Sequence, residues 1–302
     1  MNLPTLKPKS QRHHWWPVCV SREWADQDGC TNWLQPDGSL KRMPPHNLGV
    51  IGNGHYIKLG KDGKPDPWDE NFEDVFSTAD SAFPGLIRRL KALNPSNDTP
   101  RQRFIPQNIS DEEATTITEC VVSLAIRGPM NREACVALAE KFRGPLPEPE
   151  RNALIGLNMR RSQRLVADAI KARAKFVAFY SREKEFIYGD GFFHNISASV
   201  NPPMAPKILA PITPHLTLLV WRPAAYVPEP RLSTIVLTSD EVDAFNEAVQ
   251  IYSKNRIYFR SQQPVLSPEF QAEGHRHYSD TNNPIDRLLK SIPGANPRGL
   301  FM

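Results

Sequence analysis

Cysteine and long apolar runs are scarce in this sequence. Its 302 residues include 4 cysteines, none in a Cys-x-x-Cys pair, so a disulfide scaffold is not expected. No apolar stretch reaches the roughly 20 residues that a membrane-spanning helix needs. The opening residues MNLPTLKPKSQR lack the apolar segment of a secretory signal. We therefore expect a reduced, cytoplasmic protein that has no membrane partner.

Common catalytic signatures and a strong charge of one sign are missing as well. The sequence has no Gly-x-x-x-x-Gly-Lys-Ser/Thr loop, no Gly-x-Ser-x-Gly elbow and no His-Glu-x-x-His helix. This argues against a P-loop enzyme, a serine hydrolase of the elbow type and a zincin. With 37 basic and 33 acidic residues, the net charge is +4. That balance permits contact with nucleic acid but does not require it.

The pattern along the chain changes twice. Short strand-like segments come first, helical periodicity follows over about 70–175, and strand-like segments then return. This order is typical of an α+β fold, with an antiparallel sheet built from N- and C-terminal strands around a helical middle section. We expect a flexible basic arm at 1–12, one α+β domain at 13–260 and a polar, proline-rich tail at 261–302.

Turn signals predict several hairpins. Asp28-Gly29 and Asp37-Gly38 separate short apolar stretches near the N-terminus, and such Asp-Gly pairs are typical of tight β-turns. Residues 175–190 contain two aromatic, β-branched runs around the charged segment 182–185. We interpret residues 175–190 as the clearest hairpin of the chain.

Helix signals are equally local. Ser110 and Glu113 have the spacing of a capping box. We expect Asn131 to cap the next helix, and the longest helix to cover about 152–174. Pro84 lies in an otherwise helical segment, so it should kink or split that helix.

A pair of histidines stands out near the start, in RHHWWP. Neighbours on a strand point to opposite faces, so His13 and His14 share a site only if Pro17 bends the chain. Such a pair is suited to proton transfer or to binding a metal. The alternative is one surface histidine and one that is hydrogen-bonded beneath a tryptophan. The nearby tryptophans either line a cleft or form the core of a small sheet; they are Trp15, Trp16, Trp24 and Trp33.

Two further polar residues are candidates for the same site. Asp190 lies between two glycines in FIYGDGF, where a carboxylate serves either as a metal ligand or general base, or as an ordinary turn residue. Asn246 lies inside a predicted helix, although asparagine is not favoured there. A buried hydrogen bond to a neighbouring loop would explain Asn246, and exposure to solvent is the alternative.

Taken in order, these segments resemble a bacterial family known as domain of unknown function 4238, which opens with a motif of the type HHYVP. The matching text is HHWWPVCVSREWADQDG, NFEDVFSTADSAFPGLIRRL, FIYGDGFF, LAPITPHLTLLV and DAFNEAVQIYSKNRIYF. The chain departs from the family pattern at Trp15, where the motif has tyrosine, and at Gly191-Phe192, where it has asparagine and proline. The positions that match the family motifs are His13, His14, Pro17, Asp190 and Asn246, with Glu73 and Asp80. The resemblance implies that the histidine pair and Asp190 belong to one site.

The first functional hypothesis is a phosphodiester hydrolase, a nuclease-like effector in bacterial defence. His13, His14, Asp190 and Asn246 would be its catalytic residues. The two histidines and Asp190 would also hold a divalent metal ion, and basic segments would contact nucleic acid. This hypothesis requires His13 and Asp190 to converge.

Two alternative functions do not involve catalysis. The first is a ligand- or partner-binding module whose tryptophans form the contact surface. The second is an accessory protein of a mobile-element or defence complex, which contacts a protein partner through the tail 261–302.

Overall fold

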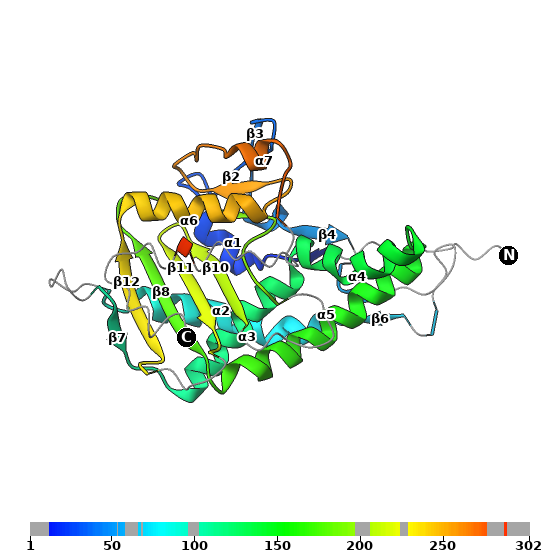
Figure 1. Cartoon of the computed structure of the whole chain (residues 1–302), viewed down its shortest axis with the longest axis horizontal. Helices are drawn as coiled ribbons and strands as arrows, with labels where there is room; N and C mark the ends of the chain where they lie inside the picture. The colour runs from blue at the N-terminus through cyan, green and yellow to red at the C-terminus, as the bar shows by residue number, and fades with distance from the viewer. Residues whose placement is uncertain are drawn as a thin grey trace.

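Two main sheets, two short two-stranded sheets and a group of helices make up the described part of the fold (Figure 1). The computed structural model describes residues 12–52, 54–57, 66–67, 69–95, 103–196, 206–223, 229–276 and 287–288. The predicted α+β class is confirmed, with strands from both ends of the chain and helices between them. Residues 1–11 of the predicted basic arm lie outside the described residues.

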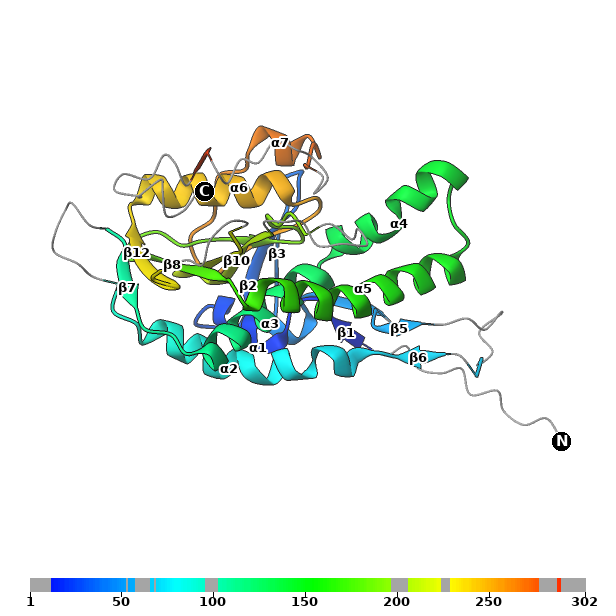
Figure 2. The ribbon, with the colours of Figure 1, turned by 60° about the horizontal axis from the view of Figure 1, so that its bottom comes forward.

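The larger sheet has the strand order β10-β11-β8-β12-β7. Neighbours pair antiparallel except β8 and β12, which run parallel from the pair Phe176–Leu232 to the pair Ser181–Leu237. Helix α6 covers one face of this sheet, and α2 and α3 lie on the other (Figure 2). The strands are β7 (Ile105–Gln107), β8 (Lys175–Ser181), β10 (Lys207–Thr213), β11 (Leu216–Trp221) and β12 (Leu232–Leu237).

The smaller sheet joins the two ends of the chain. Its order is β3-β2-β13-β9, all antiparallel. The predicted turn at Asp37-Gly38 joins β2 to β3, and Gly38 has a φ of 79°, which favours glycine. The strands are β2 (Thr31–Leu34), β3 (Leu40–Met43), β9 (Tyr188–Gly189) and β13 (Ile257–Phe259). Two short pairs complete the strands: β1 (Arg12–His14) with β4 (Val50–Gly52), and β5 (Tyr56–Ile57) with β6 (Glu70–Asn71).

The hairpin predicted over 175–190 does not form. Its two halves are β8 and β9, which belong to different sheets. Strand β8 is buried along nearly all its length and pairs with the equally apolar β11 and β12. After β8 the chain turns past the β10–β11 turn, where the Phe186 amide donates to the Pro214 carbonyl at 2.7 Å, and then reaches the smaller sheet.

The helical middle comprises η4 (Glu73–Phe76), α2 (Ser77–Lys91), α3 (Asp111–Arg127), α4 (Pro129–Arg143) and α5 (Glu148–Lys171). The capping box of Ser110 and Glu113 is confirmed at the start of α3. Asn131 is not a cap, because α4 begins at Pro129.

Pro84 does not split α2, which continues through it. Proline cannot donate to the carbonyl four residues earlier, which here belongs to Asp80. That carbonyl lies 3.8 Å from the Cys19 sulfur, which donates to it. The thiol therefore replaces a missing helix bond.

The described part of the predicted tail packs on the body. Helix α7 (Pro268–Gln271) lies beside α6 (Ser239–Tyr252), and Phe270 is fully buried. The Gln250 side chain on α6 donates to the Val265 carbonyl and accepts from the Ser267 amide. No helix in the described part of the chain is both long and apolar enough to cross a membrane. The other short helices are α1 (Val18–Ser21), η1 (Arg22–Trp24) and η2 (Pro45–Asn47).

The tryptophans belong to the core. All four are at most 5% exposed. Trp16 stacks on Tyr188 with ring centroids 4.9 Å apart, and Tyr188 stacks on Tyr258 at 4.5 Å. This confirms the small-sheet alternative over a tryptophan-lined cleft.

Candidate functional site

The adjacent histidines on β1 point in different directions. His13 is 1% exposed and turns into the protein, whereas His14 is half-buried and its Nε2 lies 3.2 Å from the carbonyl oxygen of His46. Regular pairing of β1 with β4 keeps this alternation. Pro17 comes after the strand, so it does not bring the two imidazoles together.

Asp190 stabilises the turn that leads from α6 into β13. Its carboxylate accepts hydrogen bonds from the amides of Lys254 and Asn255 and from the Asn255 side chain, at 2.8 to 3.2 Å. The neighbouring Gly191 is needed for a close approach, because a Cβ there would lie 1.9 Å from the Tyr252 carbonyl oxygen. Both residues fit closely against the protein's own backbone.

Asn246 makes the buried hydrogen bonds that its position in a helix predicts. Its side chain donates to the Glu185 carbonyl at 2.9 Å and accepts from the Ile187 amide at 3.0 Å. These bonds fasten the segment between β8 and β9 to α6.

The four predicted catalytic residues are therefore not brought together. No contact within the described part of the chain joins His13 or His14 to Asp190 or Asn246. The described residues also contain no group of three or more His, Cys, Asp or Glu side chains placed to hold a metal ion. The predicted metal set of His13, His14 and Asp190 is not assembled.

His13 instead meets a second histidine that the sequence did not single out. The rings of His13 and His55 stack with centroids 5.0 Å apart, and the His55 amide donates to His13 Nδ1 at 3.0 Å. This bond places the proton of a neutral His13 on Nε2, which lies 3.4 Å from a carboxylate oxygen of Glu73. Burial lowers the pKa of His13 although the Glu73 charge acts in the other direction, so the ring is neutral at pH 7.

His55 is more deeply enclosed. It is 2% exposed and packs against the rings of Phe72 and Phe76. Burial, assisted by the positive charge of Arg127, lowers its pKa to about 2. Both histidines are thus held uncharged.

Two arginines complete the group. Arg127 is 1% exposed, lies 4.8 Å from the Phe76 ring centroid and forms two hydrogen bonds to Asp80, at 2.6 and 3.1 Å. Arg132 donates to the Gly54 carbonyl at 2.7 Å, and burial lowers its pKa to about 10. We call His13, His55, Arg127 and Arg132 the histidine–arginine cluster.

The cluster lies behind a surface hollow of about 510 Å³. We call this the acidic hollow; it is lined by Asn71, Glu73, Asp74, Ser77, Asp80 and Ser81. Arg127 offsets the charge of Asp80, whereas Asp74 has no ion-pair partner in the described ranges and Glu73 faces a neutral imidazole. The hollow therefore keeps an excess of negative charge.

Three positions that match the family motifs lie near one another: Glu73 and Asp80 line the hollow, and His13 contacts Glu73. The site that the resemblance implied, the histidine pair with Asp190, is a different grouping. The sequence motifs did not single out His55, in the turn GNGHY, or Arg127, at the end of the apolar run CVVSLAIR. An arginine ending such a run is the one signal that could have indicated a buried charge.

Comparison with known proteins found no matching family model, no similar curated protein and no similar solved structure. The resemblance to domain of unknown function 4238 therefore stays a prediction carried by its motifs.

Proposed function

We propose that the chain is a binding module that takes a small organic cation into the acidic hollow. The observation that carries this proposal is the contact of buried, neutral His13 with Glu73 at the mouth of the cluster. His13 Nε2 lies 3.4 Å from a Glu73 carboxylate oxygen but forms no hydrogen bond with it or with another described residue, so the Glu73 carboxylate keeps its capacity to accept from a ligand.

The charge of the residues that line the hollow favours a positively charged ligand. No lysine or arginine lines the hollow, and three carboxylates do. Arg127 offsets that of Asp80. An ammonium group between Glu73 and Asp74 would form charge-assisted hydrogen bonds, which are about twice as strong as neutral ones.

The tautomer of His13 favours binding over proton abstraction. A general base needs an unprotonated nitrogen that faces the substrate, whereas Nδ1 of His13 is occupied by the His55 amide. The nitrogen next to Glu73 carries the proton, so it cannot abstract one from a substrate. Glu73, whose side chain is 51% exposed, is the group that receives the ligand.

Calorimetric titration with putrescine tests this proposal. We expect saturable binding to the full chain and a loss of at least tenfold in affinity, about 1.4 kcal/mol, in Glu73→Gln. Glu112→Gln is the matched control, because Glu112 is an exposed acid outside the hollow. The proposal fails if putrescine gives no saturable binding, or if both variants bind as tightly as wild type.

A second candidate retains the predicted phosphodiester hydrolase, a nuclease-like effector in bacterial defence. The pairing of His13 with Glu73 favours it, because a carboxylate beside an imidazole is an arrangement that orients acid–base catalysts. Nucleic acid would be the substrate and a divalent ion the cofactor. The described residues do not gather a full set of ligands for that ion, so no step is derived through it.

Cleavage of DNA and RNA with added magnesium or manganese tests the second candidate. We expect His13→Asn and Glu73→Gln to abolish cleavage, and His14→Gln, on the opposite face of β1, to retain it. Cleavage that survives in Glu73→Gln would contradict the candidate.

The proposal also covers the cellular location of the protein and its contact with a protein partner. The four cysteines are free thiols, which supports a reducing, cytoplasmic environment. The accessory-protein alternative gains no support from residues 261–276, because this part of the tail packs on the protein's own α6.

A further inference from the structure

A second pocket lies where the end of β8, the β10–β11 turn and the residue after β13 meet. Its volume is about 210 Å³, and none of its lining residues belongs to the acidic hollow. The charged and titratable residues of the lining are Glu23, Lys91, Tyr180, Arg182, His215 and Arg260.

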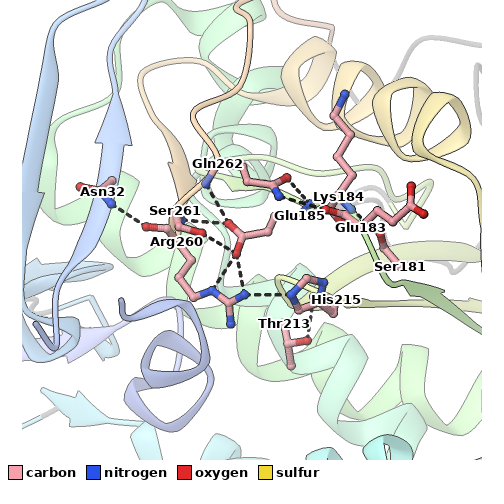
Figure 3. A network of polar contacts seen from close by, with 10 residues as sticks. All are labelled: Asn32, Ser181, Glu183, Lys184, Glu185, Thr213, His215, Arg260, Ser261 and Gln262. Atoms are coloured by element: carbon pink, nitrogen blue, oxygen red, sulfur yellow. Dashed lines mark hydrogen bonds and ion pairs between the residues drawn. The ribbon is translucent and has the colours of Figure 1, made fainter. Parts of the chain in front are cut away.

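The guanidinium of Arg260 is held by the carboxylate of the buried Glu185 (Figure 3). Glu185 is 3% exposed and accepts from Arg260 Nε at 2.8 Å, from both the amide and the hydroxyl of Ser261, and from the Gln262 amide. Burial alone would raise the pKa of Glu185, but these hydrogen bonds outweigh it and lower the pKa. The carboxylate is therefore charged and holds the guanidinium in one orientation.

His215 forms a second contact with the guanidinium of Arg260, at Nη2. Its Nε2 lies 2.8 Å from Arg260 Nη2. Burial, together with the positive charge of Arg260, lowers the pKa of His215, so the ring is neutral and accepts this hydrogen bond. The third nitrogen, Nη1, forms no hydrogen bond within the described part of the chain and carries no dashed line in Figure 3.

The remaining lining adds positive charge. Lys91 and Arg182 approach from α2 and from the end of β8, and Glu23 is the one carboxylate among the lining residues. Glu23 pairs with Lys91 at 2.5 Å. An anion that enters the pocket would meet three cations and would compete with Glu23 for Lys91.

We propose that this pocket binds the phosphate group of a small phosphorylated molecule, with Arg260 as the fixed donor and Lys91 and Arg182 as flanking cations. Its volume lies below the roughly 300–1,000 Å³ of sites that enclose a whole drug-sized ligand, so it fits one oxyanion group while the rest of the molecule stays outside. Cations that approach from separate elements suit a tetrahedral anion with several charged oxygens better than a planar carboxylate.

Titration of the full chain with inorganic phosphate and with glycerol phosphate, followed by calorimetry, tests this proposal. We expect both to bind saturably, and Lys91→Gln and Arg182→Gln each to weaken binding at least fivefold. Glu23→Gln should tighten binding because it removes the competitor for Lys91. Arg161→Gln, which removes an exposed arginine on α5, is the matched control and should bind as wild type does.

Arg260 itself is not varied, because its loss would leave Glu185 buried without its cation. No saturable binding to wild type would overturn the proposal, and so would equal weakening in Arg161→Gln or no tightening in Glu23→Gln. Binding of inorganic phosphate without glycerol phosphate would overturn the assignment to a phosphorylated molecule. Since the residues differ, these results are independent of putrescine binding in the acidic hollow.

Discussion

Arg127 and Asp80 form a two-pronged ion pair that links α3 to α2. Their closest atoms, Nη2 and Oδ1, lie 2.6 Å apart, and the side chains are 1% and 39% exposed. The guanidinium is thus inside the protein while its counter-charge lies at the edge of the acidic hollow. Removing one member of such a pair is costly, because the other charge stays buried.

We predict that Asp80→Asn lowers the free energy of unfolding by about 2 kcal/mol. The full loss for a buried pair is roughly 3–5 kcal/mol, and solvent around Asp80 reduces it. Urea unfolding measures the change. Asp74→Asn lies in the same hollow, but Asp74 is exposed and has no ion pair among the described residues, so it should change stability by less than about 0.5 kcal/mol. Equal effects of the two variants would show that the ion pair does not stabilise the fold.

Asn246→Ala should destabilise the protein by about 2–3 kcal/mol, because it leaves the Ile187 amide buried without an acceptor. Asn158→Ala is the matched control, since the Asn158 side chain donates to the Leu154 carbonyl of its own helix. Thermal unfolding compares the two variants. A smaller loss for Asn246→Ala than for Asn158→Ala would contradict the role assigned to Asn246.

The same substitution at two glycines should have opposite effects. Gly191→Ala would place a Cβ 1.9 Å from the Tyr252 carbonyl oxygen, so we expect a loss of at least about 3 kcal/mol. At Gly85, within α2, a Cβ meets nothing within 4 Å, and alanine should stabilise the helix by about 0.5–1 kcal/mol. Chemical denaturation of both variants checks the signs, and a stable Gly191→Ala protein would refute the close approach.

Stability should fall as the pH drops below about 6.5. The pKa of His55 is about 2 in the folded protein, against 6.5 as its ordinary value. Between these two pKa values, His55 is protonated in the unfolded chain but stays neutral in the folded protein. His55 stabilises the fold fully above pH 6.5, and its contribution declines by about 1.4 kcal/mol per pH unit below that.

Urea unfolding between about pH 4 and 8 measures this slope. The variant His55→Phe should show a shallower slope than wild type, whereas His46→Gln, at an exposed position, should keep the wild-type slope. Identical slopes for His55→Phe and wild type would exclude His55 as the cause.

Local signals in the sequence predicted local structure well. The capping box at Ser110 and the Asp-Gly turn at Asp37 each depend on a few neighbouring residues, and both occur where expected. Asn246 was recognised as out of place in a helix, and its hydrogen bonds explain it.

Pairing over long distances was not predictable in the same way. The runs on either side of 182–185 have the composition of a hairpin, yet β8 finds its partners in β11 and β12. Local composition predicts that a segment forms a strand, but it does not predict which strand it pairs with. For the same reason, Glu73, Asp80 and the buried Arg127 became one site only because α2 packs against α3 and because Glu73 on η4 contacts His13 on β1.

The smaller sheet has a consequence for how the protein is made. Strand β2 ends at Leu34 and its neighbour β13 begins at Ile257, so more than two hundred residues are synthesised between them. At about 5–20 residues per second, the ribosome needs roughly 11–45 s for that stretch. Through this interval the β2–β3 ribbon has an open edge next to Trp33, which invites association with other nascent chains. The pairing of β2 with β13 therefore forms only after Ile257–Phe259 have left the ribosome.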